Sequence, residues 1–181
     1  MKFSCDLPNL ETSWRRIMFN HLLVPLDGSH LAEAALPPSL ELASKFNSEI
    51  TLVWVIQPPH LIMTAANGSV YAQLLTEMRN QSEKDAESYL RGHQGSLRQQ
   101  GLVVHTRIVE GENIADALLQ VAANINADAI VMSTHGRGGI SRWVFGSVAD
   151  KVLRYANVPV LLIRAKEETL DWQAKDQQTI V

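Results

Sequence analysis

The stretch His21–Leu36, HLLVPLDGSHLAEAAL, joins a short apolar run to a helical pattern through an Asp-Gly-Ser sequence. Its first letters, LLVPL, form the nearly continuous apolar run that is typical of a strand covered on both faces. Asp27–Ser29 has the composition of a turn followed by a helix cap. This stretch therefore predicts a strand, a tight turn and a helix, which together make the first βα unit of an α/β fold.

The same alternation of apolar runs and helical patterns continues to residue 163. We expect strands at 22–26, 50–56, 102–109, 129–132 and 160–163, and helices at 31–46, 70–91, 113–124 and 147–156. Strands that alternate with helices imply a parallel sheet with right-handed crossovers and helices on both faces. The predicted fold class is α/β, with an open five-stranded parallel sheet.

Prolines and glycines interrupt two of the expected helices. Pro37 and Pro38 should kink or restart the first helix, because neither can donate a backbone hydrogen bond. Gly92 and Gly95 follow the second helical pattern and leave its end open near residue 91.

Composition excludes several classes of protein. Hydrophobic residues make up 46% of the chain and charged residues 19%, which is typical of a globular protein. The net charge of −3 gives no bulk attraction to nucleic acid or to an anionic membrane, and no apolar stretch approaches the roughly 18 residues needed to span a bilayer. The single cysteine, Cys5, rules out an intramolecular disulfide and fits a reducing compartment. We expect a cytoplasmic protein with neither a nucleic-acid nor a membrane partner.

The two ends of the chain are only weakly patterned. We expect an N-terminal extension at 1–17, one domain at 18–165 and a C-terminal tail at 166–181. The first residues lack the apolar core of a signal peptide. Because Met18 directly precedes the first strand pattern, an alternative is that translation starts there and that residues 1–17 are not made.

A glycine-rich run, STHGRGGISRWVFGSVAD at 133–150, follows the fourth expected strand. Open parallel sheets bind ligands at this carboxyl edge. The run is not a Walker A loop, and it does not satisfy GxGxxG because Ser141 stands at the last position.

The run nevertheless has the ingredients of a phosphate site. Gly136, Gly138 and Gly139 lack side chains, so backbone N–H groups there can approach an anion closely. Gly146 and Ser147 would begin the next helix, where unpaired N–H groups and the helix dipole favour negative charge.

Two interpretations of each motif stay open on physical grounds alone. The glycine run is either a phosphate cradle, to which Arg137 and Arg142 add charge-assisted hydrogen bonds, or an ordinary turn before a capped helix. Asp27 is either a ligand-binding residue or, more simply, part of a turn and cap.

The first stretch, together with MSTHGRGGISRWVFGSVADKVLRYANVPVLLI at 132–163, resembles the universal stress protein family. The resemblance covers residues 19–164. The ATP-binding branch of that family has Gly-x-x-Gly, nine residues, and then Gly-Ser or Gly-Thr. Here Gly136 is followed by the nine residues Arg137–Phe145 and then by Gly146 and Ser147, whereas Ser133 stands where the family has its first glycine.

The resemblance implies roles for particular residues. Asp27 would face the adenosine, and Val55 would place its backbone against the adenine. Gly146, Ser147 and Val148 would hold phosphate at the helix start. The ribose and phosphates would be wrapped by Ser133, Thr134, His135, Gly136, Arg137, Gly138 and Gly139, and the expected site is completed by Pro25 and Met132.

The resemblance also implies a Rossmann-like sheet with strand order 3-2-1-4-5. It implies a homodimer paired through the last strand, which contains Val160, Leu161, Leu162 and Ile163. The expected ligand is ATP, with AMP or cyclic AMP as alternatives, and Mg²⁺ would be held through the phosphates rather than by a carboxylate cage.

The hypothesis is a nucleotide-sensing switch in stress response that acts through an unknown protein partner. Two alternatives are a slow ATP-hydrolysing enzyme and a dimeric scaffold that binds no ATP. We expect no efficient ATPase, because no residue stands out as a general base and no G-x-S-x-G elbow is present.

None of the six histidines has metal-ligand spacing, so we expect no protein-built metal site. Trp143 and Phe145 are more simply read as packing residues than as base-stacking ones.

Overall fold

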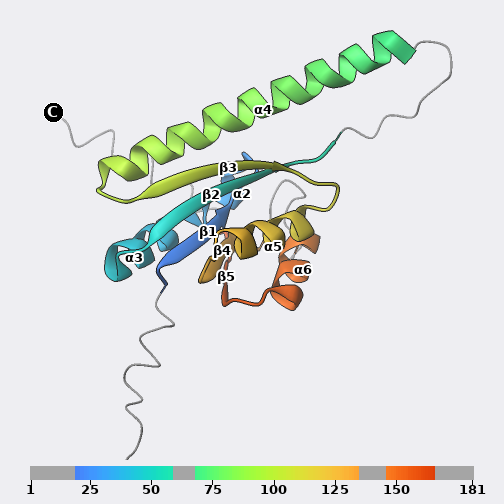
Figure 1. The fold of residues 1–181 in the computed structure, drawn as a ribbon. Coiled ribbons are helices and arrows are strands. Elements are labelled where there is room, and N and C mark those ends of the chain that lie inside the picture. Colours follow the sequence, from blue (N-terminus) through green and yellow to red (C-terminus); the bar gives the residue numbers. More distant parts are fainter. Residues whose placement is uncertain (1–18, 59–67, 135–145, 166–181) are drawn as a thin grey trace, which may run out of the picture.

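The computed structural model describes residues 19–58, 68–134 and 146–165 of the 181-residue chain (Figure 1). The strands in these ranges are β1 (His21–Pro25), β2 (Glu49–Ile56), β3 (Val104–Glu110), β4 (Ala129–Ser133) and β5 (Val160–Ile163). The helices are α2 (His30–Glu33), α3 (Leu36–Phe46), α4 (Gly68–Gln99), α5 (Ile114–Asn124) and α6 (Ser147–Tyr155). Strands and helices alternate along the chain as the sequence predicts.

The five strands form one parallel sheet in the order β3-β2-β1-β4-β5. The predicted fold class and strand order are both confirmed. Leu22 of β1 lies between Ile50 of β2 and Ala129 of β4 in the register. The chain runs outward from β1 to β3 on one side and from β4 to β5 on the other. The order in which strands are added therefore reverses between β1 and β4, and open α/β sheets bind ligands at such a reversal point.

Helices cover both faces of the sheet (Figure 1). Each of the two buried clusters combines strand residues with helix residues from one face. The cluster under α2, α3 and α4 includes Leu22, Val24, Ile50, Leu52, Leu36, Ala43, Leu90 and Leu97. The cluster under α5 and α6 includes Leu23, Val53, Ile130, Met132, Leu118, Val121 and Val152. Burial of each large aliphatic side chain contributes about 1.5–3 kcal/mol, so these clusters fix the strand ends that form the candidate site.

The expected helix at 31–46 is divided into α2 and α3, as the two prolines predict. Pro37 and Pro38 lie in the first turn of α3, where a missing N–H group costs no hydrogen bond. The helix ends at Phe46, and the left-handed φ of 56° at the following Asn47 closes the last turn.

Helix α4 is longer than expected, so an end near residue 91 was wrong. It continues through Gly92 and Gly95 to Gln99, and a Cβ atom at either glycine would meet nothing within 4 Å. Leu97 is buried in the core, and its packing overrides the low helix propensity of the glycines. The chain turns at Gly101, whose φ of 84° suits glycine.

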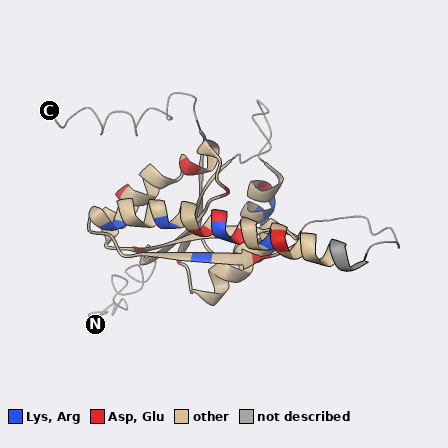
Figure 2. Cartoon of the chain, turned by 90° about the horizontal axis from the view of Figure 1, so that it is seen from above, with Lys and Arg blue, Asp and Glu red and all other residues tan. Residues whose placement is uncertain are grey.

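The last turns of α4 also protect the outer edge of the sheet. Gln94 and Arg98 both donate hydrogen bonds to the carbonyl of Val104 in the edge strand β3. The first turns of α4 extend beyond the sheet (Figure 1), and charges of both signs are interspersed along the helix (Figure 2). Among the described residues, no helix is both long enough and apolar enough to cross a membrane.

Candidate functional site

The turn after β1 is built by a short hydrogen-bonded sequence. Asp27 Oδ1 accepts hydrogen bonds from the backbone N–H of Ser29 at 3.0 Å and from its hydroxyl at 2.6 Å. Ser29 Oγ in turn accepts from the N–H of Ala32 and caps α2. Gly28 has a φ of 80°, which other residues adopt only with strain. The turn-and-cap interpretation of Asp27 is therefore correct as a description of its local structure.

The end of β4 and the start of α6 meet directly. Thr134 donates its N–H to the carbonyl of Ile163 in β5, and its own carbonyl accepts from the N–H of Gly146 at 2.9 Å. Gly146 is the cap of α6, and Ser147 is the first helical residue. Residues 134 and 146, which flank the central part of the glycine-rich run, are thus held together at the carboxyl edge.

Helix α6 begins without a side-chain cap. Gly146 has an extended ψ of 148° and no side chain to accept a hydrogen bond. The first intrahelical bond runs from the N–H of Asp150 to the carbonyl of Gly146. The N–H groups of Ser147, Val148 and Ala149 precede that bond, so the helix itself supplies them with no acceptor. Such a helix start favours an anion through its N–H groups and its dipole.

The backbone of Val55 faces the same edge. Odd-numbered residues of β2 bond toward β1, since Leu26 donates its N–H to the carbonyl of Val53 at 2.8 Å. The paired register of β1 and β2 ends at Pro25 and Val53. Val55, two residues further on, therefore points its N–H and carbonyl past the end of that ladder. The expected contact between the backbone of Val55 and an adenine ring requires its N–H and carbonyl groups to point in this direction.

The remaining candidate residues at the strand ends are mostly buried. Met132 packs in the core beneath α5 and α6. Ser133 and Thr134 are only 6% and 5% exposed, and both lie beside Ile163 of β5 at the end of β4. Ser147 is exposed and Val148 is half-buried at the start of α6.

Several predicted site residues lie outside the described ranges. They are His135, Gly136, Arg137, Gly138 and Gly139, and the same holds for Arg142, Trp143 and Phe145. The described candidates come from the ends of β1, β2 and β4 and from the start of α6, and they all lie at the carboxyl edge of the sheet.

A polar cluster near this edge was missed at the level of sequence. Glu33 of α2 is buried and contacts Tyr89 and His93 of α4. Most side chains of α4 before residue 89 are exposed to solvent, but Tyr89 and His93 are partly buried. The available signal was the four-residue spacing of Tyr89 and His93, which is the spacing of one helix face.

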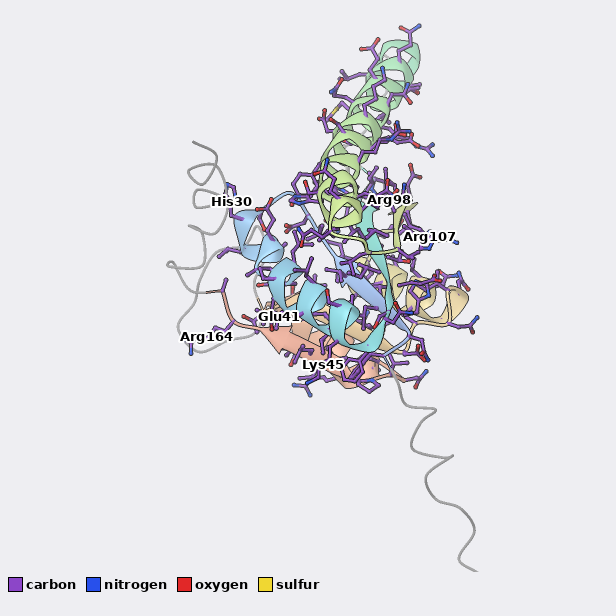
Figure 3. All side chains as sticks on the ribbon, turned by 90° about the vertical axis from the view of Figure 1, so that its left-hand side faces the viewer. His30, Glu41, Lys45, Arg98, Arg107 and Arg164 are labelled. Carbon is purple, nitrogen blue, oxygen red and sulfur yellow. The ribbon has the colours of Figure 1, made fainter. Side chains whose placement is uncertain are left out.

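A separate hollow of about 590 Å³ lies over β2 and β3 and is lined by none of the candidate residues. Its lining includes His21, His105 and Arg107, and His21 Nε2 lies 2.7 Å from Thr51 Oγ1. In the view of Figure 3, Arg107 lies on the opposite side from His30 at the start of α2. In the described part of the chain, no group of three or more His, Cys, Asp or Glu side chains is arranged to hold a metal ion.

Comparison with known proteins identifies the family. A model of the universal stress protein family matches residues 18–164. Universal stress protein MJ0531 of Methanocaldococcus jannaschii is 28% identical over 147 residues, which are 81% of this chain and 83% of that protein. A protein of Staphylococcus aureus strain USA300 is 31% identical over 158 residues, which are 87% of this chain and 91% of its own length.

Solved structures agree with the fold. The structure of the protein MJ0577 superposes with a TM-score of 0.71 at 25% identity and covers 83% of this chain and 99% of its own. A universal stress protein in complex with cAMP has a TM-score of 0.60 at 20% identity, covering 82% and 99% of the two chains. A universal stress protein of Archaeoglobus fulgidus in complex with dAMP has a TM-score of 0.57 at 20% identity, covering 81% and 98%. The chain described here belongs to the universal stress protein family.

Proposed function

We propose that this chain binds an adenine nucleotide, preferentially ATP, at the carboxyl edge of its sheet. The observation that supports this most directly is the start of α6. The N–H group of Gly146 donates to the carbonyl of Thr134, and the first N–H groups of the helix follow a cap residue that has no side-chain acceptor. A phosphate group is the ligand that suits such a helix start.

In this proposal Asp27 and Val55 select the nucleoside. Asp27 is half-buried at the end of β1, and the backbone of Val55 faces past the last paired residues of β1 and β2. An adenine ring at this point would lie on the strand ends near Pro25 and Met132 and would hydrogen-bond to backbone groups.

The segment 133–139 would wrap the ribose and phosphates, with Arg137 and His135 as additional donors. Gly146, Ser147 and Val148 would hold the terminal phosphates. Mg²⁺ would bind to phosphate oxygens and water, since such an ion needs few protein ligands. When a triphosphate is bound, the ion would neutralise part of its negative charge.

Two relatives support an adenine nucleotide as the class of ligand. One universal stress protein of the same fold was solved in complex with cAMP and another in complex with dAMP. The spacing from Gly136 across nine residues to Gly146 and Ser147 resembles that of the family's ATP-binding branch, and this resemblance favours ATP over these monophosphates for this chain.

We further propose that the domain at 18–165 acts as a nucleotide-sensing switch in the cytoplasm, where the bound state changes the preferred protein partner. An ATP-hydrolysing enzyme is the alternative. Steady-state phosphate release that Gly146→Val abolishes would favour the enzyme, whereas release at the background rate favours the switch.

Nucleotide released from freshly purified full-length protein tests the proposal. The protein is denatured, and the supernatant is separated by HPLC and identified by mass spectrometry. We expect an adenine nucleotide, and we expect ATP to compete for the emptied site more strongly than AMP or cyclic AMP. Absence of any adenine nucleotide, together with no binding of these three below about 1 mM, would contradict it.

Homodimerisation through β5 is a second proposed property, and it is shared by the alternative of a scaffold that binds no ATP. β5 is an edge strand, and Leu161 on it is 42% exposed. An exposed apolar edge strand is a template for pairing with a second copy. Analytical ultracentrifugation should give a dimer for the natural chain and a monomer for Leu161→Lys. A dimer of unchanged stability in that variant would contradict pairing through this strand.

A further inference from the structure

A buried carboxylate lies next to the proposed nucleoside contacts but is not one of them. The side chain of Glu33, at the end of α2, is only 11% exposed. Its Oε1 accepts a hydrogen bond from the hydroxyl of Tyr89 at 2.8 Å and lies 3.4 Å from Nε2 of His93. Its Oε2 lies 3.1 Å from Nδ1 of His30, which Figure 3 labels at the start of α2.

Aromatic packing extends this cluster onto the sheet. The ring of Tyr89 meets that of Trp54 edge-on, with centroids 5.3 Å apart, and that of His93 at 4.6 Å. Trp54 directly precedes Val55 in β2. The cluster therefore joins α2, β2 and the C-terminal half of α4, and through β2 it reaches one of the elements that form the proposed site.

Helix α2 has Ser29, the hydrogen-bond partner of Asp27, as its N-terminal cap and Glu33 as its last residue. Helix α2 has four residues, and its cap Ser29 is the residue that Asp27 accepts from. One helical turn, about 5.4 Å, separates the two ends. An isolated helix of this length is unstable because nucleation costs more than one turn returns. Tertiary contacts must therefore hold α2, and the described polar ones come from Tyr89 and His93.

Electrostatics link the two ends as well. Burial, the hydrogen bond to Glu33, and the negative charges of Glu33 and Asp27 all raise the pKa of Tyr89 above its ordinary value. Tyr89 thus keeps its proton at neutral pH and remains a donor to Glu33.

We propose that Glu33, Tyr89 and His93 are positioning residues that couple α4 to the nucleotide site. They hold α2 in place, and α2 holds the carboxylate of Asp27 toward the nucleoside. This inference rests on the proposed function. Because coupling is reciprocal, nucleotide binding must also stabilise the part of α4 that contacts Glu33.

Calorimetric titration of ATP into the full chain tests the first half of the inference. Tyr89→Phe removes only the hydroxyl, and Glu33→Gln keeps the volume but loses the charge. Tyr89→Phe loses one buried hydrogen bond and Glu33→Gln loses the charge that strengthens it, so both variants should bind ATP about threefold to tenfold more weakly. Tyr155→Phe, on an exposed tyrosine of α6, is the matched control and should bind as the natural chain does.

Amide hydrogen exchange on the natural chain tests the second half without any variant. ATP should slow exchange at residues 86–93 of α4 more than in α5, and this difference should disappear in Tyr89→Phe. The inference is overturned if the natural chain, Tyr89→Phe and Glu33→Gln bind ATP equally well. It is also overturned if ATP slows exchange in α4 no more than in α5. Either result leaves the proposed function intact. If the natural chain binds no adenine nucleotide, both fail.

Discussion

Two helices, α2 and α6, begin at the same edge of the sheet, but they begin in different ways. The start of α2 is closed by the protein, because Ser29 caps it and Asp27 holds Ser29. The start of α6 has Gly146 as its cap, and this residue has no side chain that could accept a hydrogen bond. Helix α5 resembles α2 in this respect, since Asn113 accepts a hydrogen bond from the N–H of Asp116.

The difference indicates that the two helix starts have different roles at the proposed site. A closed helix start is rigid, and it positions a side chain such as Asp27. An uncapped helix start retains backbone donors for an external anion. A glycine cap costs only a few tenths of a kcal/mol relative to a polar cap, so an open anion site requires little loss of stability.

The largest expected effect comes from closing α6 with a side chain. Gly146→Asp and Gly146→Asn both place a cap acceptor at a residue whose extended backbone accommodates it, but only Asp adds a negative charge. Repulsion between this charge and phosphate should weaken ATP binding about 50-fold, against less than about tenfold for Asn. Calorimetry measures both, and urea unfolding should show that neither variant is destabilised. Equal affinity in the Asp and Asn variants would contradict phosphate binding at α6.

A smaller effect is expected at Asp27, where two variants separate the turn from the ligand. Asp27→Asn keeps an Oδ1 that can accept from Ser29, whereas Asp27→Ala removes it. Both should weaken ATP binding about tenfold, since a charge-assisted hydrogen bond is lost. Only the alanine variant should lose about 1 kcal/mol of unfolding free energy. If Asp27→Asn binds ATP as the natural chain does, Asp27 serves the turn alone.

The two serines at these helix starts give a direct test on stability. Ser29→Ala removes the cap of α2 and should lower the free energy of unfolding by about 1 kcal/mol. Ser147→Ala, at the exposed first residue of α6, should change it by less than about 0.5 kcal/mol. Urea denaturation with a common slope measures both. A loss at Ser147 that matched the loss at Ser29 would show that α6 is closed by its own serine.

The smallest effect concerns the pH dependence of the contacts that hold α2. Burial, the hydrogen bond to Glu33 and the nearby negative charges raise the pKa of Tyr89, so the folded state favours the neutral phenol. This contribution is fully present below the ordinary pKa of about 10 and is lost as the pH rises through the higher folded value. Urea unfolding from pH 8 to about pH 11 should therefore show a steeper loss for the natural chain than for Tyr89→Phe. Parallel curves would contradict the role given to this hydroxyl.

The sequence predicted the elements that local patterns determine. Continuous apolar runs identified the strands, alternation with helices predicted the parallel sheet, and Pro37 and Pro38 predicted the restart at α3. Gly146 and Ser147 were expected at a helix start and are found there. These features depend on residues that lie within one turn or one strand of each other.

Features that depend on distant contacts were not predictable in this way. The end of α4 is set by the burial of Leu97 and by hydrogen bonds from Arg98 to Val104, which outweigh two glycines. The burial of Glu33 depends on Tyr89, which is 56 positions away in the sequence. Periodicity reports which face of a helix is apolar, but it does not report which polar residues another helix will cover.

Calorimetric titration of ATP with Mg²⁺ into the emptied natural chain tests the central claim most directly. We predict one nucleotide per chain with a dissociation constant well below about 1 mM, and binding about 50-fold weaker in Gly146→Asp. Absence of binding below about 1 mM for ATP, AMP and cyclic AMP alike would contradict the claim that this edge of the sheet is a nucleotide site.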